Sequence, residues 1–277
     1  MKIGIVGGGF VGSATALLRC PEIEVVTYDL DPTRCIPLGT TVADLVGADF
    51  VFVCVPTPAF EDGRCNTAVV ERCIAGLKAA GVTNLVLRST VPPGTSDRLD
   101  VLFMPEFLTE ANWRTDFVSC RDWFFGVRDA STDAAKFQEL LDTAAAAGVV
   151  ASNRCRFMTP TEAEMVKYAR NCFLATKIGF CNEMYRLCGA VGASYESVQL
   201  GLTTDPRIGG SHTGVPGYDG HFGFGGTCLP KDTAALSAFA AGHGVPAPIL
   251  DAIVFRNKNV DRPERDWEAD PRAFTRQ

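Results

Sequence analysis

The feature that most constrains this chain lies at its beginning. A short apolar segment, Lys2 to Val6, runs directly into three glycines and then into a helix-forming stretch, and residues 7–12 read GGGFVG. The pattern is G-x-G-x-x-G in a strand–turn–helix context. Such glycines permit a tight turn and let a phosphate approach the start of the helix, where free N–H groups and the helix dipole favour anions. We therefore expect a dinucleotide-binding βαβ unit whose cofactor contacts are Gly7, Gly9, Phe10, Val11 and Gly12.

The second apolar segment, residues 24–28, supports this interpretation because it ends at Asp29. A carboxylate at this spacing accepts hydrogen bonds from both ribose hydroxyls and repels a 2′-phosphate, so the sequence favours NAD over NADP. Arg34 is a further candidate on the adenosine side, although a solvated helix residue is the simpler interpretation. Thr57 and Thr90 complete the expected cofactor contacts.

Strand-like and helix-like segments alternate up to about residue 153. Apolar runs at 50–55 and 85–87 are typical of strands buried on both faces, and residues 132–147 predict a helix with Thr132 as its N-cap. Alternation of this kind predicts an α/β fold with a Rossmann-like, doubly wound parallel sheet. We assign residues 1–155 to this expected NAD-binding domain.

A change of pattern follows residue 153. Thr159-Pro160-Thr161-Glu162 has the spacing of a capping box and opens a long helical pattern that runs to about Cys188. That helix carries too many apolar residues for one narrow stripe, so we expect a second subunit to cover it in at least a homodimer. We assign residues 156–262 to a smaller all-α dimerisation domain and residues 263–277 to a flexible tail.

Composition excludes several classes of protein. The 277 residues carry a formal net charge of −6, and the 11 cysteines include no C-x-x-C pair. Neither a nucleic-acid partner nor a structural zinc site is expected from this. The N-terminus resembles neither a signal peptide nor a membrane span, so we expect a soluble protein of the reducing cytoplasm with no membrane partner. His212, His221 and Asp219 share a glycine-rich loop, where we expect ordinary loop residues and no metal.

The sharpest chemical signal is residues 223–232, GFGGTCLPKD. Its glycines let the backbone come close to a ligand. A cysteine just before a helix can have a lowered pKa, and Lys231 nearby adds to that effect on Cys228. A thiolate is the nucleophile of covalent aldehyde oxidation. The alternative is that Cys228 is one more small buried side chain.

Three other segments place polar residues where they can serve a site. Lys167 and Asn171 are four residues apart, so they share one helix face and can stabilise a developing oxyanion together. Glu106 and Glu110 are two carboxylates within residues 105–110. Thr90 follows a predicted strand, at the edge where parallel sheets bind ligands.

Together these stretches resemble the UDP-glucose/GDP-mannose dehydrogenase family. The matching segments run in family order over most of the chain and read GGGFVG, YDLDP, VFVCVPTP, RSTVPPGT, MPEFLTEA, AEMVKYARNCFLATKIGFCNE, DPRIG and GFGGTCLPKD. The resemblance implies an NAD-dependent, four-electron oxidation of a nucleotide-sugar C6 alcohol to the carboxylate. A thiohemiacetal and then a thioester form on the cysteine.

The same resemblance implies a role for each site residue. Cys228 matches the nucleophile, Asp232 and Thr90 the pair that positions a water, and Glu106 the glutamate that assists thioester hydrolysis. Lys167 and Asn171 match the oxyanion donors. The residues that match substrate contacts are Glu110, Lys231 and Arg207, the last of which reaches across a subunit interface.

Two departures from the family fall on the substrate side. The chain stops at Gln277, before the usual C-terminal nucleotide-binding domain, and the segment between Arg207 and Cys228 is a few residues longer than usual. They leave open a second class of function, a degenerate or split-enzyme NAD-binding subunit without activity of its own. A two-electron 3-hydroxy-acid dehydrogenase is a further alternative, since its architecture is similar and it needs no cysteine nucleophile.

Overall fold

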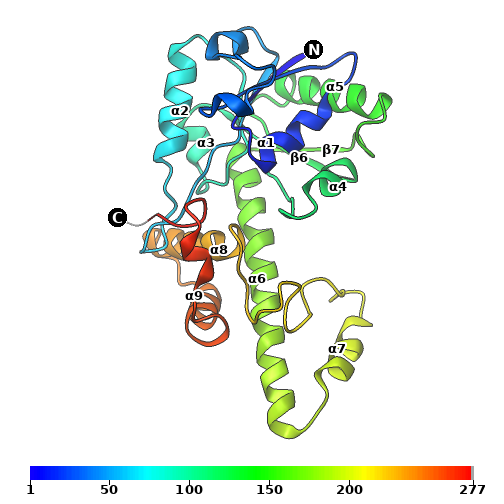
Figure 1. The fold of residues 1–277 in the computed structure, drawn as a ribbon, viewed down its shortest axis with the longest axis vertical. Coiled ribbons are helices and arrows are strands. Elements are labelled where there is room, and N and C mark those ends of the chain that lie inside the picture. The colour runs from blue at the N-terminus through cyan, green and yellow to red at the C-terminus, as the bar shows by residue number, and fades with distance from the viewer. Residues whose placement is uncertain (276–277) are drawn as a thin grey trace. The chain divides into compact units, whose positions relative to one another are not determined.

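The computed structural model describes residues 1–275, which form two compact units (Figure 1). The first unit comprises Met1–Thr57 and Thr67–Lys167, and the second comprises Pro58–Asn66 together with the chain from Tyr168 on. The sequence placed a domain boundary between residues 155 and 156. The division into compact units falls instead within one long helix, α6 (Pro160–Val191).

The first unit is built on a seven-stranded sheet in the order β2-β1-β3-β4-β5-β6-β7. Every neighbouring pair is parallel except β5 and β6, which are antiparallel. The strands are β1 (Lys2–Val6), β2 (Glu24–Tyr28), β3 (Phe50–Val53), β4 (Leu85–Leu87), β5 (Leu102–Phe103), β6 (Trp123–Gly126) and β7 (Cys155–Met158).

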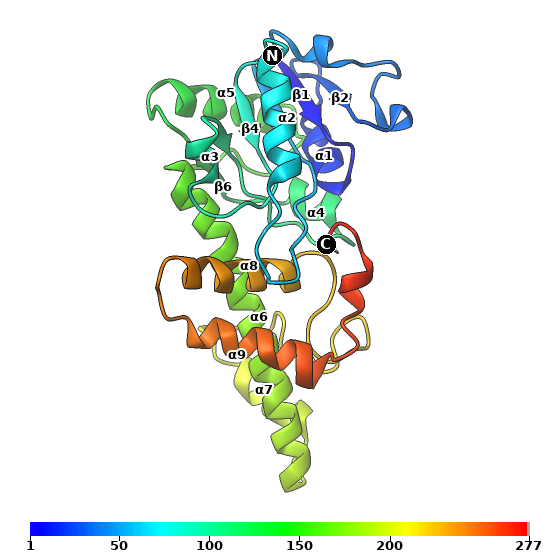
Figure 2. The ribbon, with the colours of Figure 1, turned by 90° about the vertical axis from the view of Figure 1, so that its left-hand side faces the viewer.

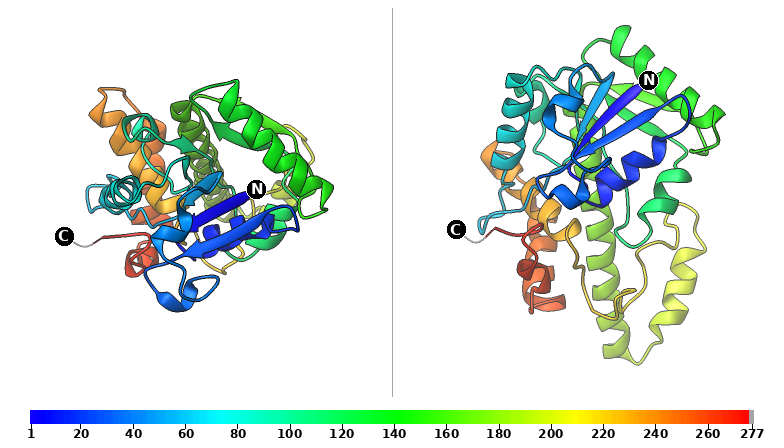
Figure 3. Two further views of the ribbon diagram at one scale, coloured as in Figure 1. Left: turned by 90° about the horizontal axis from the view of Figure 1, so that it is seen from above. Right: turned by 45° about the horizontal axis from the view of Figure 1, so that its top comes forward.

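Helices cover both faces of this sheet, as the doubly wound prediction requires (Figure 3). Because side chains alternate along a strand, Phe50 and Phe52 pack on one face while Val51 and Val53 pack on the other. The first face is covered by α1 (Phe10–Thr15), α4 (Trp113–Val118) and α5 (Thr132–Ala146). The second is covered by α2 (Ala68–Ala79). A further short helix, α3 (Thr95–Arg98), follows β4.

The strand order reverses between β1 and β3, which makes their carboxyl ends the switch point of the sheet. Open α/β sheets bind ligands in the crevice at such a point. The glycine turn follows β1, and the segment that leads to Thr57 follows β3. The fold therefore brings two of the expected cofactor segments to one edge.

The second unit is helical. It contains α6 from Tyr168 on, together with α7 (Tyr195–Thr203), α8 (Leu229–Gly242), α9 (Pro248–Arg256) and the π-helix η4 (Asn257–Asp261). Helices α8 and α9 pack side by side (Figure 2). A small core joins Ala175 of α6, Ile253 of α9 and Phe224 from the loop before α8.

A short hairpin, Pro58–Asn66, joins this unit. Ala59 forms bridges with Cys65 and with Phe274, and its N–H donates to the carbonyl of Ala273 at 2.9 Å. The sequence predicted a flexible tail from residue 263. In the structure, residues 263–275 form turns and a 3₁₀ helix, η5 (Asp266–Ala269), with Trp267 buried. Residues 276 and 277 lie outside the described part of the chain.

Most of the predicted elements are present. The strands at 2–6, 24–28 and 85–87 and the helix from Thr132 are confirmed, although the N-cap of that helix is Ser131. The capping box before α6 is confirmed by the bonds that Thr159 and Glu162 exchange, at 2.7 and 3.3 Å. Strands β5, β6 and β7 were not predicted. Among residues 1–275, no helix combines the length and the apolar character that crossing a membrane requires.

Candidate active site

The glycine turn between β1 and α1 requires glycine at two positions. Gly7 has a φ of 100°, and a Cβ there would lie 2.4 Å from the carbonyl oxygen of Cys54. A Cβ on Gly12 would lie 1.9 Å from the carbonyl oxygen of Gly7. Around Gly9, by contrast, a Cβ would meet nothing within 4 Å. Gly7 and Gly12 are thus needed to build the turn. Gly9, which precedes the helical residues Phe10 and Val11, faces open space instead.

Asp29 at the end of β2 is tied to this turn. Its Oδ2 accepts from the N–H of Gly8 at 2.6 Å, and its Oδ1 accepts from the N–H of Asp31 at 2.8 Å. The carboxylate therefore lies beside the turn, and its predicted contact with a ribose stays a prediction. Arg34 is exposed and pairs with Asp31 at 3.6 Å. It lies close to the turn, because a Cβ added at Gly8 would be 3.0 Å from the Cβ of Arg34.

The segments after β3 and β4 are joined by Ser89. Its hydroxyl accepts from the N–H of Val55 at 3.0 Å and donates to the carbonyl of Val55 at 2.7 Å. Thr57 and Thr90, the candidates that follow these two residues, are both buried. One hydroxyl thus fixes the register between the two segments that carry the candidate threonines.

Glu106 and Lys167 form a buried ion pair. The Nζ of Lys167 lies 2.5 Å from Oε1 of Glu106 and donates to the Glu106 carbonyl at 2.8 Å. Burial opposes the charge on Glu106, but the ammonium of Lys167 outweighs it and lowers the pKa of this carboxyl. The carboxyl of Glu106 is therefore ionised at neutral pH, and it holds the lysine.

Sequence reasoning missed two buried ionisable residues in the first unit. Glu164 accepts from the N–H groups of Gly94 and Ser96, at 2.6 and 2.8 Å, and so fixes the loop that follows Thr90. Burial raises the pKa of Glu164 to about 7. Arg88 is also buried and donates to the hydroxyl of Thr15 at 3.1 Å. Both lie inside quoted motifs, and a charged residue within an apolar stretch was the available signal.

In the second unit, Cys228 is the N-cap residue of α8 and is partly exposed. Asp232, in the first turn of that helix, is buried and accepts two bonds. Its Oδ1 lies 2.5 Å from Nζ of Lys231, and its Oδ2 accepts from Nδ2 of Asn171 at 2.6 Å. Burial opposes the charge on Lys231, but the Asp232 carboxylate more than offsets this and raises the pKa of Lys231. One carboxylate therefore orders a lysine and an amide beside the cysteine-bearing helix start.

The structure thus gathers the predicted residues into two groups, each within one unit. Glu106 and Lys167 meet in the first unit, and Asn171, Lys231 and Asp232 meet in the second. Glu110 is exposed in the loop after β5. Arg207 is exposed after α7 and pairs with Asp205 at 2.5 Å.

The glycine-rich loop of the second unit carries His212 and His221. His221 faces Glu264 at 3.5 Å. Burial lowers the pKa of His212, and Lys177 adds to the effect. Within the part of the chain that the structure describes, no three His, Cys, Asp or Glu residues are grouped as metal ligands.

A doubly wound sheet with a glycine turn after β1 and an acid at the end of β2 defines the dinucleotide-binding class of α/β proteins. Two sequence profiles of the UDP-glucose/GDP-mannose dehydrogenase family match the chain. The profile of the NAD-binding domain matches residues 38–144, and that of the central domain matches residues 161–259. The chain belongs to this family and contains its NAD-binding domain.

Individual relatives agree with this assignment. Over 93% of its length, the chain is 33% identical to a UDP-glucose 6-dehydrogenase of Pseudomonas aeruginosa and 30% identical to UDP-glucose 6-dehydrogenase TuaD of Bacillus subtilis. It spans 65% and 63% of the lengths of these two proteins. A solved UDP-glucose dehydrogenase from the archaeon Pyrobaculum islandicum is similar with a TM-score of 0.79 and 28% identity, over 93% of this chain and 68% of that one.

Proposed function

We propose that this protein oxidises the C6 alcohol of a nucleotide sugar to the carboxylate in an NAD-dependent, four-electron reaction, as a UDP-glucose 6-dehydrogenase does. The observation that carries the proposal is the arrangement at the start of α8. Cys228 caps the helix, and Asp232 in its first turn holds both Lys231 and Asn171. A nucleophile, a cation and an amide donor are the groups that thioester chemistry needs.

The cofactor proposal rests on the turn after β1. Gly9 leaves the space that a pyrophosphate needs, and Asp29 lies beside Gly8 with a carboxylate suited to ribose hydroxyls. We propose NAD as the cofactor, held by this turn with further contacts from Phe10, Val11, Arg34, Thr57 and Thr90. When bound, NAD supplies the hydride acceptor for both oxidations.

The chain's own residues then have distinct tasks. The thiolate of Cys228 attacks the aldehyde carbon to give a thiohemiacetal, and loss of hydride from that carbon gives a thioester. Lys167 and Asn171 stabilise the oxygen anion that develops at each stage. Water, positioned by Asp232 and Thr90 and assisted by Glu106, adds to the thioester, and the carboxylate leaves as the thiolate is restored.

Substrate contacts and assembly complete the proposal. Glu110 and Lys231 contact the sugar, and Arg207, exposed on its loop, reaches the nucleotide sugar of a partner subunit in a homodimer. The helical region 156–262 forms the dimer contact. We place the protein in the cytoplasm, where nucleotide sugars are made and where thiols stay reduced.

A screen of UDP- and GDP-sugars for NADH formation tests this proposal. We expect one nucleotide sugar to be oxidised with NAD, and we expect NADP to be a poor substitute because of Asp29. If no nucleotide sugar yields NADH while NAD still binds, the alternative of an NAD-binding subunit without independent activity is correct. One NADH per molecule of a 3-hydroxy acid would instead identify a two-electron dehydrogenase.

A further inference from the structure

The loop before Cys228 approaches the end of α9 unusually closely. Gly223 has a φ of 66°, and a Cβ at this position would lie 2.4 Å from Oδ1 of Asn257 and 3.1 Å from Cβ of Asp261. The glycine is therefore required by a neighbouring side chain as well as by the turn itself. The neighbour is η4, the π-helix that continues α9.

Asn257, the first residue of η4, holds both polar groups of one loop residue. Its Oδ1 accepts from the N–H of Phe224 at 2.8 Å, and its Nδ2 donates to the carbonyl of Phe224 at 2.9 Å. From α6, Oδ1 of Asn182 accepts from the N–H of Gly223 at 3.1 Å. Both asparagines are buried, and the Phe224 ring packs into the core of the unit. The loop is thus held through its backbone and its side chain at once.

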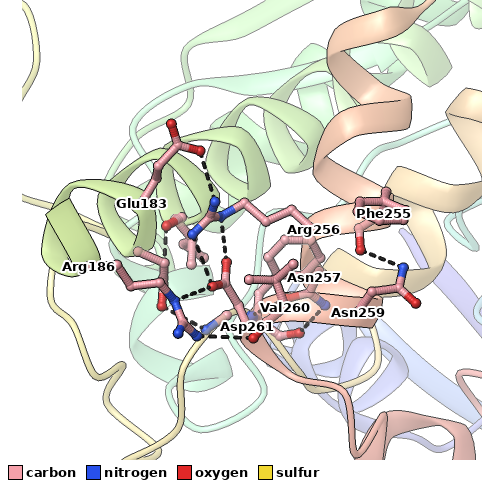
Figure 4. A network of polar contacts seen from close by, with 12 residues as sticks. Glu183, Arg186, Phe255, Arg256, Asn257, Asn259, Val260 and Asp261 are labelled. Carbon is pink, nitrogen blue, oxygen red and sulfur yellow. Dashed lines mark hydrogen bonds and ion pairs between the residues drawn. The ribbon is translucent and has the colours of Figure 1, made fainter. Parts of the chain in front are cut away.

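The segment that carries Asn257 is itself anchored by charge. Arg186 of α6 and Arg256 of α9 converge on the buried carboxylate of Asp261, with N–O distances of 3.3 and 2.8 Å (Figure 4). Arg256 also pairs with Glu183 at 2.8 Å. Ion pairs to two helices fix the far end of η4, so the position of Asn257 follows from the packing of α6 and α9. Single π-helical turns are frequent at functional sites.

A second contact secures the loop two residues further on. A Cβ on Gly225 would lie 2.5 Å from Cζ of Arg262, so the guanidinium lies directly against this backbone. Arg262 is held there by Asp219 at 2.7 Å and Asp266 at 2.5 Å. Residues 223–225 are therefore held at each position, and the last of them lies three positions before Cys228, the N-cap of α8.

We propose that Asn257 is a positioning residue for Cys228, acting through the backbone of Phe224. An amide that pairs with the N–H and the C=O of one residue prevents rotation of both adjoining peptides, and it thereby fixes where α8 and its N-cap thiol begin. Misplacement of a reacting group by about 1 Å can lower a rate by about 10²-fold. The inference rests on the proposed role of Cys228 as nucleophile and extends it to a residue that contacts neither substrate nor cofactor.

Three variants test the proposal. Asn257→Ala removes both bonds to Phe224. Asn257→Asp keeps the acceptor but replaces the donor with an oxygen that faces the Phe224 carbonyl. Asn259→Ala is the matched control, because Asn259 lies on the same π-helical turn but is exposed and has no bond to Phe224 among the described contacts; it donates to the carbonyl of Phe255 and accepts from Arg265 at 3.4 Å. The measurements are the rate of Cys228 alkylation by iodoacetamide, followed by peptide mass spectrometry, and kcat and KM with the best nucleotide sugar.

We expect Asn257→Ala to slow Cys228 alkylation at least fivefold and to lower kcat about 10²-fold, with the KM for NAD within twofold. For Asn259→Ala, the alkylation rate, kcat and the KM for NAD should each stay within twofold of the parent. Burial raises the pKa of a carboxyl. When the carboxyl introduced by Asn257→Asp is protonated, it again offers one donor and one acceptor, as the amide did. The kcat of Asn257→Asp relative to the parent should therefore rise as the pH falls from about 9 to about 6.

A folded Asn257→Ala protein with parental alkylation rate and kcat would overturn the proposal. If that variant does not fold, a pH-independent ratio for Asn257→Asp overturns it equally. Alkylation needs neither NAD nor sugar, so it judges the positioning role even if the proposed reaction fails. A parent protein that makes no NADH, combined with slowed alkylation in Asn257→Ala, would refute the reaction and keep the positioning role.

Discussion

Lys167 and Glu106 lie 2.5 Å apart as a buried ion pair, with 3% and 5% of their side chains exposed. Removing one partner leaves the other charge buried and unpaired, which typically costs about 3–5 kcal/mol of stability. We therefore expect Glu106→Ala and Lys167→Ala each to lower the free energy of unfolding by this amount in urea titrations. The double variant should lose less than the sum of the two losses. Additive losses would show that the charges do not depend on each other.

The glycine turn offers a matched pair of substitutions. Gly12→Ala brings its Cβ to 1.9 Å from the carbonyl oxygen of Gly7, so the turn must shift and the protein should lose stability. Gly9→Ala meets nothing within 4 Å in the protein, so its melting temperature should be unchanged. We expect Gly9→Ala nevertheless to weaken NAD binding at least tenfold in calorimetric titrations, because the added methyl occupies the space of the pyrophosphate. Parental affinity in Gly9→Ala would place the cofactor elsewhere.

Glu164 predicts a pH dependence of stability. Its pKa is raised from an ordinary value of 4.5 to about 7, mainly by burial. A raised pKa means that the folded state favours the protonated form, so the stabilising contribution is complete below 4.5 and is lost as the pH rises through 7. Relative to Glu164→Gln, the free energy of unfolding of the parent should fall by on the order of 3 kcal/mol between pH 4.5 and pH 7. If the free energy of unfolding instead increased with pH, the N–H groups of Gly94 and Ser96 would be stabilising the carboxylate form.

Assembly is testable on the part of α6 within the second unit. Phe173, Phe180 and Leu187 recur every seven residues, so they lie along one face of the helix, and each is at least half exposed. We expect the parent to sediment as a dimer and Phe173→Asp combined with Phe180→Asp to sediment as a monomer. Leu38→Asp, at an exposed position of the first unit, is the control and should leave the dimer intact. A parent that is fully active as a monomer would refute the dimer.

The sequence predicted strands β1 to β4 and the glycine turn well because these follow from local chemistry. An apolar run, a glycine pattern and an acid at the end of a strand are visible within thirty residues of each other, and the structure places Asp29 beside Gly8. Strands β5 and β7 were not predicted because neither shows a clear apolar period. Strand β5 has only 2 residues, and β7 is half-exposed. Their place is decided by neighbouring strands.

The partners of the site residues were less visible. Lys167 and Asn171 share a helix face in the sequence, yet one pairs with Glu106 and the other with Asp232, each 61 positions away. Asn257 gave no signal at all, since its role depends on a backbone that lies 33 positions earlier. Hydrogen bonds over such separations come from tertiary packing, which no local pattern encodes.

We propose that Cys228 carries the sugar through a thioester. The most direct test counts NADH and carboxylate for the parent and for Cys228→Ser with the nucleotide sugar that the screen identifies. We expect two NADH and one carboxylate per sugar for the parent. For Cys228→Ser we expect no carboxylate, with NAD affinity retained. One NADH per sugar from the parent, or full carboxylate formation by Cys228→Ser, would contradict the proposal.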